Sequence, residues 1–232
     1  MKRLWLFDVD GTLINAHGLG RRALERAFLE RYGWERATEG VSFAGGTDPW
    51  IVGQVFARRG LEPPPLGELR AFLALYAGFL AAEAQAPGAR AEVLPGVPAL
   101  LEALAQRTAR GRQVVLTGNC AAGAQVKLEL AGLHGHFACG AYGDEAVQRE
   151  DLLPIALERA AETFGERFEP ARAVVVGDSL RDIDVARAHG AKAVAVATGW
   201  VSRGELEAAG ADVVLDDFRD LEGTLALVGA LE

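Results

Sequence analysis

The stretch Leu4-Trp5-Leu6-Phe7-Asp8-Val9-Asp10-Gly11-Thr12 decides the fold of this chain and points to its chemistry. Its apolar residues predict a buried strand, and two carboxylates follow where that strand ends. Side chains alternate along an extended chain, so Asp8 and Asp10 can face the same way, and Gly11 permits a tight turn. At about 4 Å and an effective dielectric near 20, two carboxylates repel each other by roughly 4 kcal/mol. Such a turn therefore favours the binding of a divalent metal ion.

The composition indicates a globular protein with a substantial core. The chain has 232 residues, 50% of them hydrophobic, and a net charge of −8. This length suffices for one large core and permits a second, smaller domain. The negative charge argues against nucleic acid or an acidic membrane as a partner, because phosphate backbones are bound mainly through Lys and Arg. Cys120 and Cys139 form neither a C-x-x-C pair nor a disulfide framework, which favours a reducing cytoplasm.

The apolar segments are too short for a signal peptide or a membrane span. Only Leu4 to Phe7 precede the first carboxylate as a strongly apolar run, which is far shorter than the core of a signal peptide. The longest apolar stretch, Ala71 to Ala82, is shorter than the roughly 20 residues that cross a bilayer. We therefore expect a protein that is neither secreted nor inserted in a membrane.

The order of predicted elements divides the chain into two parts. Residues 15–90 hold helical patterns and no convincing β-run, and the predicted helices are Gly20–Tyr32, Pro49–Arg59 and Leu66–Gln85. From Val97 onward, helices and apolar strands alternate: helices at 97–110, 121–131, 150–165 and 180–189, and strands at 113–117, 172–177, 192–197 and 212–215. This alternation predicts a parallel sheet covered by helices, with ligands at the carboxyl ends of the strands. Gly and Pro residues near 14–18 and 87–96 mark the expected hinges.

Two more strand ends carry polar residues. Thr117-Gly118-Asn119 follows one predicted strand and precedes a helix, which is an anion-binding arrangement but also an ordinary capped turn. The next predicted strand ends in the segment Gly177-Asp178-Ser179-Leu180-Arg181-Asp182. Asp178 is predicted to be a metal ligand, and Asp182, one helical turn on, to return to the same site. Asp184 is interpreted as a structural residue on the first turns of that helix.

In this order, the three segments resemble the motifs of the haloacid dehalogenase-like superfamily of phosphotransferases, and the resemblance spans nearly the whole chain. It implies an α/β fold with a Rossmann-like parallel-sheet core, formed by residues 1–14 and 94–232. It also implies an inserted α-helical cap domain of the four-helix type at residues 15–93. The nearest branches of the superfamily are phosphoglycolate phosphatase-like and β-phosphoglucomutase-like.

The resemblance further implies an aspartyl-phosphate mechanism. Asp8 attacks phosphorus, and Asp10 protonates the leaving oxygen and then deprotonates the hydrolytic water. The resemblance implies that Asp8, the backbone carbonyl of Asp10 and Asp178 hold Mg²⁺, with Asp182 behind these ligands. Thr117, Gly118 and Asn119 hold the phosphoryl oxygens.

One motif departs from the family pattern. The family ordinarily offers a Lys in the third motif, yet no Lys occurs between Lys127 and Lys192. Arg149 stands in that place and is predicted to supply the cation that pairs with Asp8 and with phosphate. Guanidinium and ammonium differ in reach and geometry. Lys127 is the alternative, although its position within a predicted helix is more typical of a solvated surface lysine.

Asp10 favours phosphoryl transfer over dehalogenation, because dehalogenases need no acid for the leaving group. The loop Phe43-Ala44-Gly45-Gly46-Thr47-Asp48 resembles the specificity loop of capped phosphatases, so Gly46, Thr47 and Asp48 are expected near the substrate. We predict a Mg²⁺-dependent phosphatase for a small phosphorylated metabolite, acting as a monomer or homodimer. A sugar-phosphate mutase is the alternative, and a non-catalytic phosphoacceptor module is a further one.

The remaining candidates receive structural interpretations. His134 and His136 occupy a Gly-rich turn without a matching acid or cysteine, so they are expected at the surface. Cys120 lies near the phosphate turn, but the sequence shows no base for it. The arginines of the helical insert are expected to be solvated, and Trp200 is expected to pack in the core.

Overall fold

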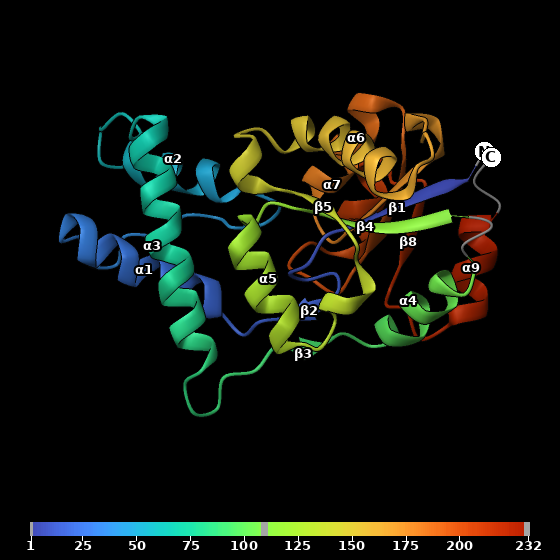
Figure 1. Ribbon diagram of the computed structural model, residues 1–232, viewed down its shortest axis with the longest axis horizontal. Helices are drawn as coiled ribbons and strands as arrows, with labels where there is room; N and C mark the ends of the chain where they lie inside the picture. The colour runs from blue at the N-terminus through green and yellow to red at the C-terminus, as the bar shows by residue number, and fades with distance from the viewer. Residues whose placement is uncertain (1, 108–110, 230–232) are drawn as a thin grey trace.

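A parallel sheet of six strands forms the centre of the computed structural model, which describes residues 2–107 and 111–229 (Figure 1). The strand order is β5-β4-β1-β6-β7-β8, and every neighbouring pair is parallel. The strands are β1 (Arg3–Phe7), β4 (Gly111–Thr117), β5 (Gly140–Tyr142), β6 (Ala173–Gly177), β7 (Lys192–Val196) and β8 (Val213–Leu215). The predicted α/β class is confirmed.

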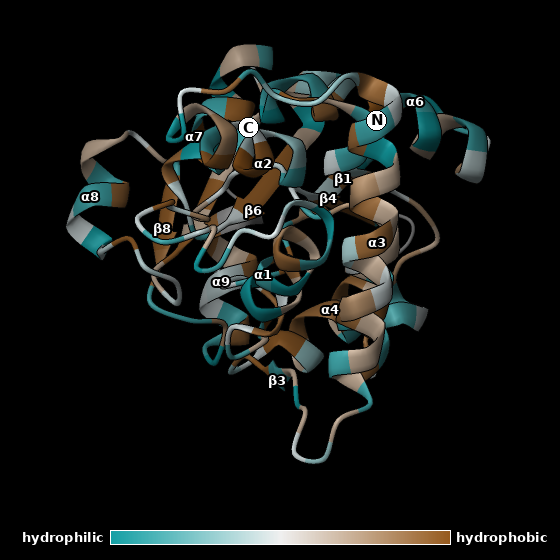
Figure 2. Cartoon of the chain, turned by 90° about the vertical axis from the view of Figure 1, so that its left-hand side faces the viewer, coloured by the Kyte–Doolittle hydropathy of each residue, from teal (hydrophilic) through white to brown (hydrophobic). Residues whose placement is uncertain are grey.

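Helices cover both faces of this sheet, as the alternating pattern predicts. They are α4 (Val97–Ala105), α5 (Ala121–Leu130), α6 (Leu152–Phe164), α7 (Leu180–His189), α8 (Arg203–Ala208) and α9 (Leu221–Gly229). Alternate strand residues enter two separate cores: Leu4 and Leu6 pack with α6 and α7, whereas Trp5 and Phe7 pack on the opposite face. Figure 2 shows hydrophobic strands in the interior and helices of mixed hydropathy around them.

The inserted segment forms a helical cap beside the sheet (Figure 1). Its helices are α1 (Leu19–Tyr32), α2 (Asp48–Ala57) and α3 (Leu66–Ala84). Residues 35–40 form turns, so three α-helices stand where the family resemblance implies four. An aromatic cluster that includes Phe28, Phe56 and Phe72 fills the cap interior. This interior is continuous with the apolar core on one face of the sheet, so the cap is anchored by burial as well as by its connections.

The two connections to the cap pair with each other. Strands β2 (Ile14–Asn15) and β3 (Glu92–Val93) form an antiparallel ribbon, with Ile14 opposite Val93. His17 and Glu92 approach to 3.2 Å beside it. The ribbon lies within the predicted hinge segments, whereas the domain boundaries themselves stay a prediction.

Some predicted elements differ from those observed. The sequence pattern does not predict β2, β3, β5, α8 or α9, because each is short and gives a weak periodic signal. The predicted helix 97–110 ends earlier, since α4 stops at Ala105, and residues 108–110 lie outside the described part of the chain. Four 3₁₀ turns also appear: His134–His136, Gly143–Glu145, Arg149–Asp151 and Pro170–Arg172.

Candidate active site

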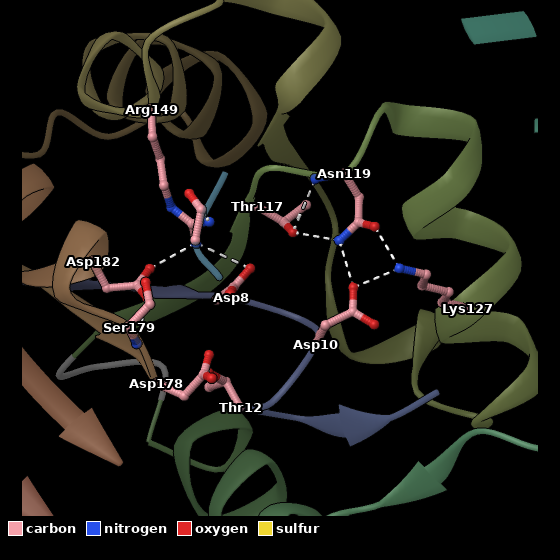
Figure 3. Close-up of polar contacts among 11 residues, drawn as sticks. Asp8, Asp10, Thr12, Thr117, Asn119, Lys127, Arg149, Asp178, Ser179 and Asp182 are labelled. Carbon is pink, nitrogen blue, oxygen red and sulfur yellow. Dashed lines mark hydrogen bonds and ion pairs between the residues drawn. The ribbon is translucent and has the colours of Figure 1, made fainter. Parts of the chain in front are cut away.

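The three polar motifs meet at the carboxyl ends of β1, β4 and β6, which are neighbours in the sheet. After β1 the chain builds β4 and β5 on one side, and then β6, β7 and β8 on the other. The reversal creates a crevice at the end of β1, the usual ligand site of such sheets. Asp8 follows β1, Thr117 ends β4 and Asp178 follows β6 (Figure 3).

Three carboxylates gather at this crevice. Asp8, Asp178 and Asp182 each offer an oxygen, and these oxygens lie within 4.8 Å of one another. Burial raises the pKa of Asp8 to about 6, while Arg149 opposes that rise. Burial and the neighbouring carboxylates also raise the pKa of Asp178 well above its ordinary value. Such a buried oxygen set with unbalanced negative charge fits a hard divalent cation such as Mg²⁺.

Asp182 and Asp178 differ in the hydrogen bonds that they accept from the protein. Asp182 accepts hydrogen bonds from Ser179 Oγ at 2.6 Å and Ser179 N at 3.1 Å on one oxygen, and from Arg149 Nη2 at 2.6 Å on the other. Asp178 Oδ1 accepts a long bond, 3.3 Å, from Thr12 Oγ1, and the carboxyl also has a hydrogen bond to the backbone of Asp178 itself. Asp182 is therefore engaged by protein donors, as a residue behind the metal would be, whereas Asp178 keeps more capacity for a cation.

Asp178 is wedged between two glycines. A Cβ at Gly11 would lie 2.3 Å from Asp178 Oδ2, and one at Gly199 would lie 1.6 Å from the same atom. Gly11 also has a φ of 79°, which favours glycine. Thr198 Oγ1 donates to the Gly11 carbonyl at 2.6 Å and ties the two loops together. The position of this carboxylate thus depends on glycine at both neighbours.

Arg149 lies in the centre of the acid cluster. Its Nη2 is 3.0 Å from Asp8 Oδ1 and 2.6 Å from Asp182 Oδ1, and its Nη1 donates to the Gly45 carbonyl at 3.0 Å. The side chain is buried, and its Nε has no hydrogen-bond partner. Burial alone would lower the pKa of Arg149, but Asp182 and Asp8 outweigh it and raise that pKa. The predicted pairing of Arg149 with Asp8 is present in the structure.

Asp10 occupies a different environment from Asp8. Its Oδ2 accepts hydrogen bonds from Lys127 Nζ at 2.5 Å and from Asn119 Nδ2 at 2.8 Å. Asn119 also donates through Nδ2 to Thr117 Oγ1 at 2.8 Å, and Thr117 hydrogen-bonds to Asp8. The Asp10 side chain is 41% exposed, while that of Asp8 is 7% exposed. Asp8 is thus buried beside Arg149, whereas Asp10 is partly exposed and lies beside Lys127 and Asn119 (Figure 3).

The expectation that Lys127 is a solvated surface lysine is wrong. Its side chain is 5% exposed, because the cap covers the face of α5 on which it lies. The periodic pattern of α5 alone could not show this, since the covering helices come from a distant part of the sequence. Both candidate cations therefore enter the site, each beside its own aspartate.

The cap loop contacts the core directly. Asp48 N donates to the Gly118 carbonyl at 2.7 Å, and Asp48 Oδ2 accepts from Cys120 N, also at 2.7 Å. Thr47 Oγ1 donates to the Val147 carbonyl at 2.6 Å. Burial raises the pKa of Asp48 to about 6, opposed by the bond from Cys120 and by Lys127.

Gly46 lies over the turn formed by Thr117, Gly118 and Asn119, where a Cβ on Gly118 would be 2.0 Å from the Gly46 carbonyl oxygen. The side chains of Thr47 and Asp48, which are expected near the substrate, form hydrogen bonds to the core. The loop thus closes over the crevice through its backbone and through these two side chains.

The other candidates do not join the site. Trp200 is 94% exposed, so the expected packing role is wrong. Asp184 is exposed and pairs with Arg187 at 3.5 Å, in agreement with its structural interpretation. Burial raises the pKa of the Cys120 thiol, so the thiolate that a cysteine nucleophile requires is disfavoured. Both cysteines are free, and no helix among the described residues is long and apolar enough to cross a membrane.

Ser179 contributes to the site without having been singled out from the sequence. It precedes α7 and forms a capping box with Asp182, in which each side chain bonds to the other's backbone N–H. The spacing Ser179-Leu180-Arg181-Asp182 is a recognisable signal of such a box, so the sequence does contain the information.

Comparison with known proteins supports the same family. A family model described as haloacid dehalogenase-like hydrolase matches residues 2–190. A phosphoglycolate phosphatase of Rhodospirillum rubrum is 34% identical over 95% of this chain and 90% of its own length. The protein CbbY of Cereibacter sphaeroides is 29% identical over 96% of this chain and 95% of its own.

Solved structures agree with the sequence relatives. CbbY from Rhodobacter sphaeroides in complex with phosphate has a TM-score of 0.71 and 26% identity, covering 95% of this chain and 96% of that one. A variant of the same protein in complex with xylulose-(1,5)bisphosphate has a TM-score of 0.70 at the same identity, with the same coverage of both chains. From its motifs, its sheet topology and these matches, the chain belongs to the haloacid dehalogenase-like hydrolases.

Proposed function

We propose that this hydrolase is a Mg²⁺-dependent phosphatase that cleaves a small phosphomonoester through an aspartyl-phosphate intermediate. The observation that carries the proposal is the division of two neighbouring aspartates between two environments. Asp8 is buried beside Arg149 and the other acids, and Asp10 is partly exposed beside Lys127 and Asn119. Nucleophilic attack and proton transfer require such different settings for two groups of the same kind.

Asp8 is the proposed nucleophile. Its Oδ1 lies 3.0 Å from Arg149 Nη2, so the guanidinium can offset the repulsion between this carboxylate and a phosphate dianion. Asp8, Asp178 and the Asp10 carbonyl would hold the metal, with Asp182 behind them. When bound, Mg²⁺ would supply further positive charge toward the phosphoryl oxygens.

Asp10 is the proposed acid and base. As Asp8 attacks phosphorus and the ester P–O bond breaks, Asp10 gives its proton to the leaving oxygen. It then takes a proton from the water that attacks the phosphorus of phospho-Asp8, which restores the Asp8 carboxylate and releases inorganic phosphate. Thr117 and the amides of Gly118 and Asn119, at the N-terminal side of α5, are proposed to hold phosphoryl oxygens.

The relatives support the substrate class. Two sequence relatives are named phosphoglycolate phosphatase, and one structural relative binds xylulose-(1,5)bisphosphate. We propose a small phosphorylated carbohydrate or hydroxy acid as the substrate of this chain. The cap loop, which closes over Gly118 and Arg149, would shape the space for the leaving group.

The mutase alternative receives less support from the cap. A mutase must hold a second phosphate, and several cap arginines have other partners. Arg21 donates to Thr38 at 3.0 Å, Arg22 pairs with Glu83 at 3.3 Å, and Arg59 donates to Val55 at 3.1 Å. These guanidinium groups stabilise the cap itself, which leaves hydrolysis as the favoured reaction. A phosphoacceptor module would need neither this cap nor Asp10.

A panel of esters tests the proposal. The protein is incubated with MgCl₂ and 2-phosphoglycolate, xylulose 1,5-bisphosphate, a hexose 1-phosphate or 4-nitrophenyl phosphate, and released phosphate is measured. We expect hydrolysis that EDTA abolishes and that Asp8→Asn lowers by at least about 10⁴-fold. Isomerisation of the hexose phosphate without phosphate release would favour the mutase, and a stable phosphorylated Asp8 without turnover would favour the phosphoacceptor.

A further inference from the structure

Lys127 is the buried cation that the family motifs do not account for. We propose that it is a positioning residue, which fixes the carboxyl group of Asp10 toward the leaving oxygen and depends on the cap for its own position. The inference rests on the proposed function, because it concerns the group that protonates the leaving oxygen. It assigns the two cations of the site to two different carboxylates, the proposed nucleophile and the proposed acid.

The first support is a closed triangle of hydrogen bonds. Lys127 Nζ donates to Asp10 Oδ2 at 2.5 Å and to Asn119 Oδ1 at 2.6 Å, while Asn119 Nδ2 donates to the same Asp10 oxygen at 2.8 Å. Both contacts fall on Oδ2, so among the contacts described they leave Oδ1 for proton exchange with the substrate. A carboxyl held on one oxygen by two donors has little rotational freedom.

The second support is the burial of the ammonium group. A lysine that is 95% buried carries a large desolvation penalty, which only close partners can offset. The described charged groups that face it are Asp10 on the turn after β1 and Asp48 on α2, and neutral Asn119 and Cys120 lie beside it. Burial of a lysine on α5 would be unfavourable if its side chain made only a surface contact, because lysines are rarely buried unless they are paired.

The third support is that the cap encloses this lysine. A Cβ at Gly20, on α1, would lie 3.2 Å from Lys127 Nζ and 3.2 Å from Tyr76 OH on α3. Glycine at this position therefore leaves just enough room for the ammonium group between the two cap helices. Cap and core together place Lys127, and Lys127 places Asp10.

The two cations act on different carboxylates. Arg149 contacts Asp8 and Asp182 but not Asp10, and Lys127 contacts Asp10 but not Asp8, among the ion pairs of the described residues. A change at Arg149 should therefore impair attack on every ester. A change at Lys127 should impair only the delivery of a proton, and it should matter most where the leaving oxygen needs one.

Leaving-group dependence tests this assignment. We would measure kcat/KM, which reports phosphoryl transfer to Asp8, on 2,4-dinitrophenyl, 4-nitrophenyl and phenyl phosphate with saturating MgCl₂. The dinitrophenolate leaves without protonation, whereas phenolate needs an acid. We expect Lys127→Met to lower kcat/KM for phenyl phosphate by about 10- to 100-fold more than for the dinitrophenyl ester. Arg149→Met should lower all of them by a similar factor.

Two further variants serve as probe and control. Gly20→Ala changes none of the three residues of the hydrogen-bond triangle, but its Cβ crowds Lys127. It should therefore produce the same leaving-group dependence, with a smaller loss of kcat/KM. Lys192→Met removes a half-exposed lysine paired with Asp212 and should leave all esters at the wild-type rate. Circular dichroism confirms that each variant is folded.

The outcomes separate this inference from the proposed function. Equal losses on all esters in both Lys127→Met and Gly20→Ala would overturn the positioning role, while wild-type turnover would still support a phosphatase. Absence of wild-type turnover on every ester would overturn both. A steeper dependence on the leaving group in both variants would support the role.

Discussion

Replacing Arg149 by methionine tests whether the acid cluster is held together by one buried cation. The side chain is buried, and its Nη2 lies 3.0 Å from Asp8 and 2.6 Å from Asp182. At such distances and an effective dielectric near 20, each attraction amounts to about 5–6 kcal/mol before desolvation. Methionine fills a similar volume without charge, and removing one partner of a buried pair costs about 3–5 kcal/mol.

The loss should depend on pH. Asp8 already has a folded-state pKa of about 6, above its ordinary value of 3.8, so the folded protein binds more protons than the unfolded chain between these values. Stability associated with Asp8 is therefore fully present below its ordinary pKa of 3.8 and is lost as the pH rises through about 6. Without Arg149 the folded-state pKa of Asp8 rises further. The deficit of the variant should then grow above pH 6, by up to about 1.4 kcal/mol per pH unit for one extra bound proton.

Urea unfolding at pH 5, 6.5 and 8, with EDTA to remove metal ions, measures this deficit. We expect a small difference from wild type at pH 5 and a deficit that is larger by up to about 3 kcal/mol at pH 8, two pH units above the pKa of Asp8. Arg203→Met, which removes an exposed guanidinium paired with Asp216, is the matched control and should leave the unfolding midpoint unchanged. A deficit of equal size at all three pH values would show that lost packing, and not lost charge, explains the change.

Two glycine substitutions test the geometry around the crevice. Gly199→Ala places a Cβ 1.6 Å from Asp178 Oδ2, so it should weaken Mg²⁺ binding by about 10- to 100-fold in calorimetric titration. Gly204→Ala, which has open space around it, is the control and should bind Mg²⁺ as the wild type does. Equal Mg²⁺ affinities in the two variants would contradict Asp178 as a ligand. Gly118→Ala places a Cβ 2.0 Å from the Gly46 carbonyl oxygen and should displace the cap loop, lowering kcat/KM by on the order of 100-fold. Gly53→Ala, in the interior of α2, is its control and should retain full activity, and small-angle scattering should show expansion only in the Gly118 variant.

Most of the catalytic edge could be predicted because the signals are local. Each of Asp8, Thr117 and Asp178 follows an apolar run that is long enough to be recognised as a strand. Parallel strands bring their carboxyl ends to one edge, so three separate motifs predict one site. The pairing of Arg149 with Asp8 followed from its place in the motif order, although its contact with Gly45 did not.

What escaped prediction depends on contacts between distant segments. The burial of Lys127 comes from helices that lie about 50 to 110 residues earlier in the chain, and nothing in the local pattern of α5 indicates them. The hydrogen bonds of Thr47 and Asp48 to the core have the same origin. Strand β5 escaped because Gly140-Ala141-Tyr142 is too short to show alternation, and it exists through pairing with β4. Trp200 was misjudged because hydrophobic residues are not always buried.

The cap loop gives a physical reason for an arginine at the position where the family resemblance implies a lysine. An ammonium group is a compact charge, whereas a guanidinium presents five donors in a fixed plane. Here Nη2 serves Asp8 and Asp182 while Nη1 reaches the Gly45 carbonyl of the cap. The residue that neutralises the proposed nucleophile is thus also a direct contact to the closed cap. Because the two functions reside on one planar group, Arg149→Lys should retain the charge and yet lose the cap contact, so that KM rises even where kcat is partly preserved.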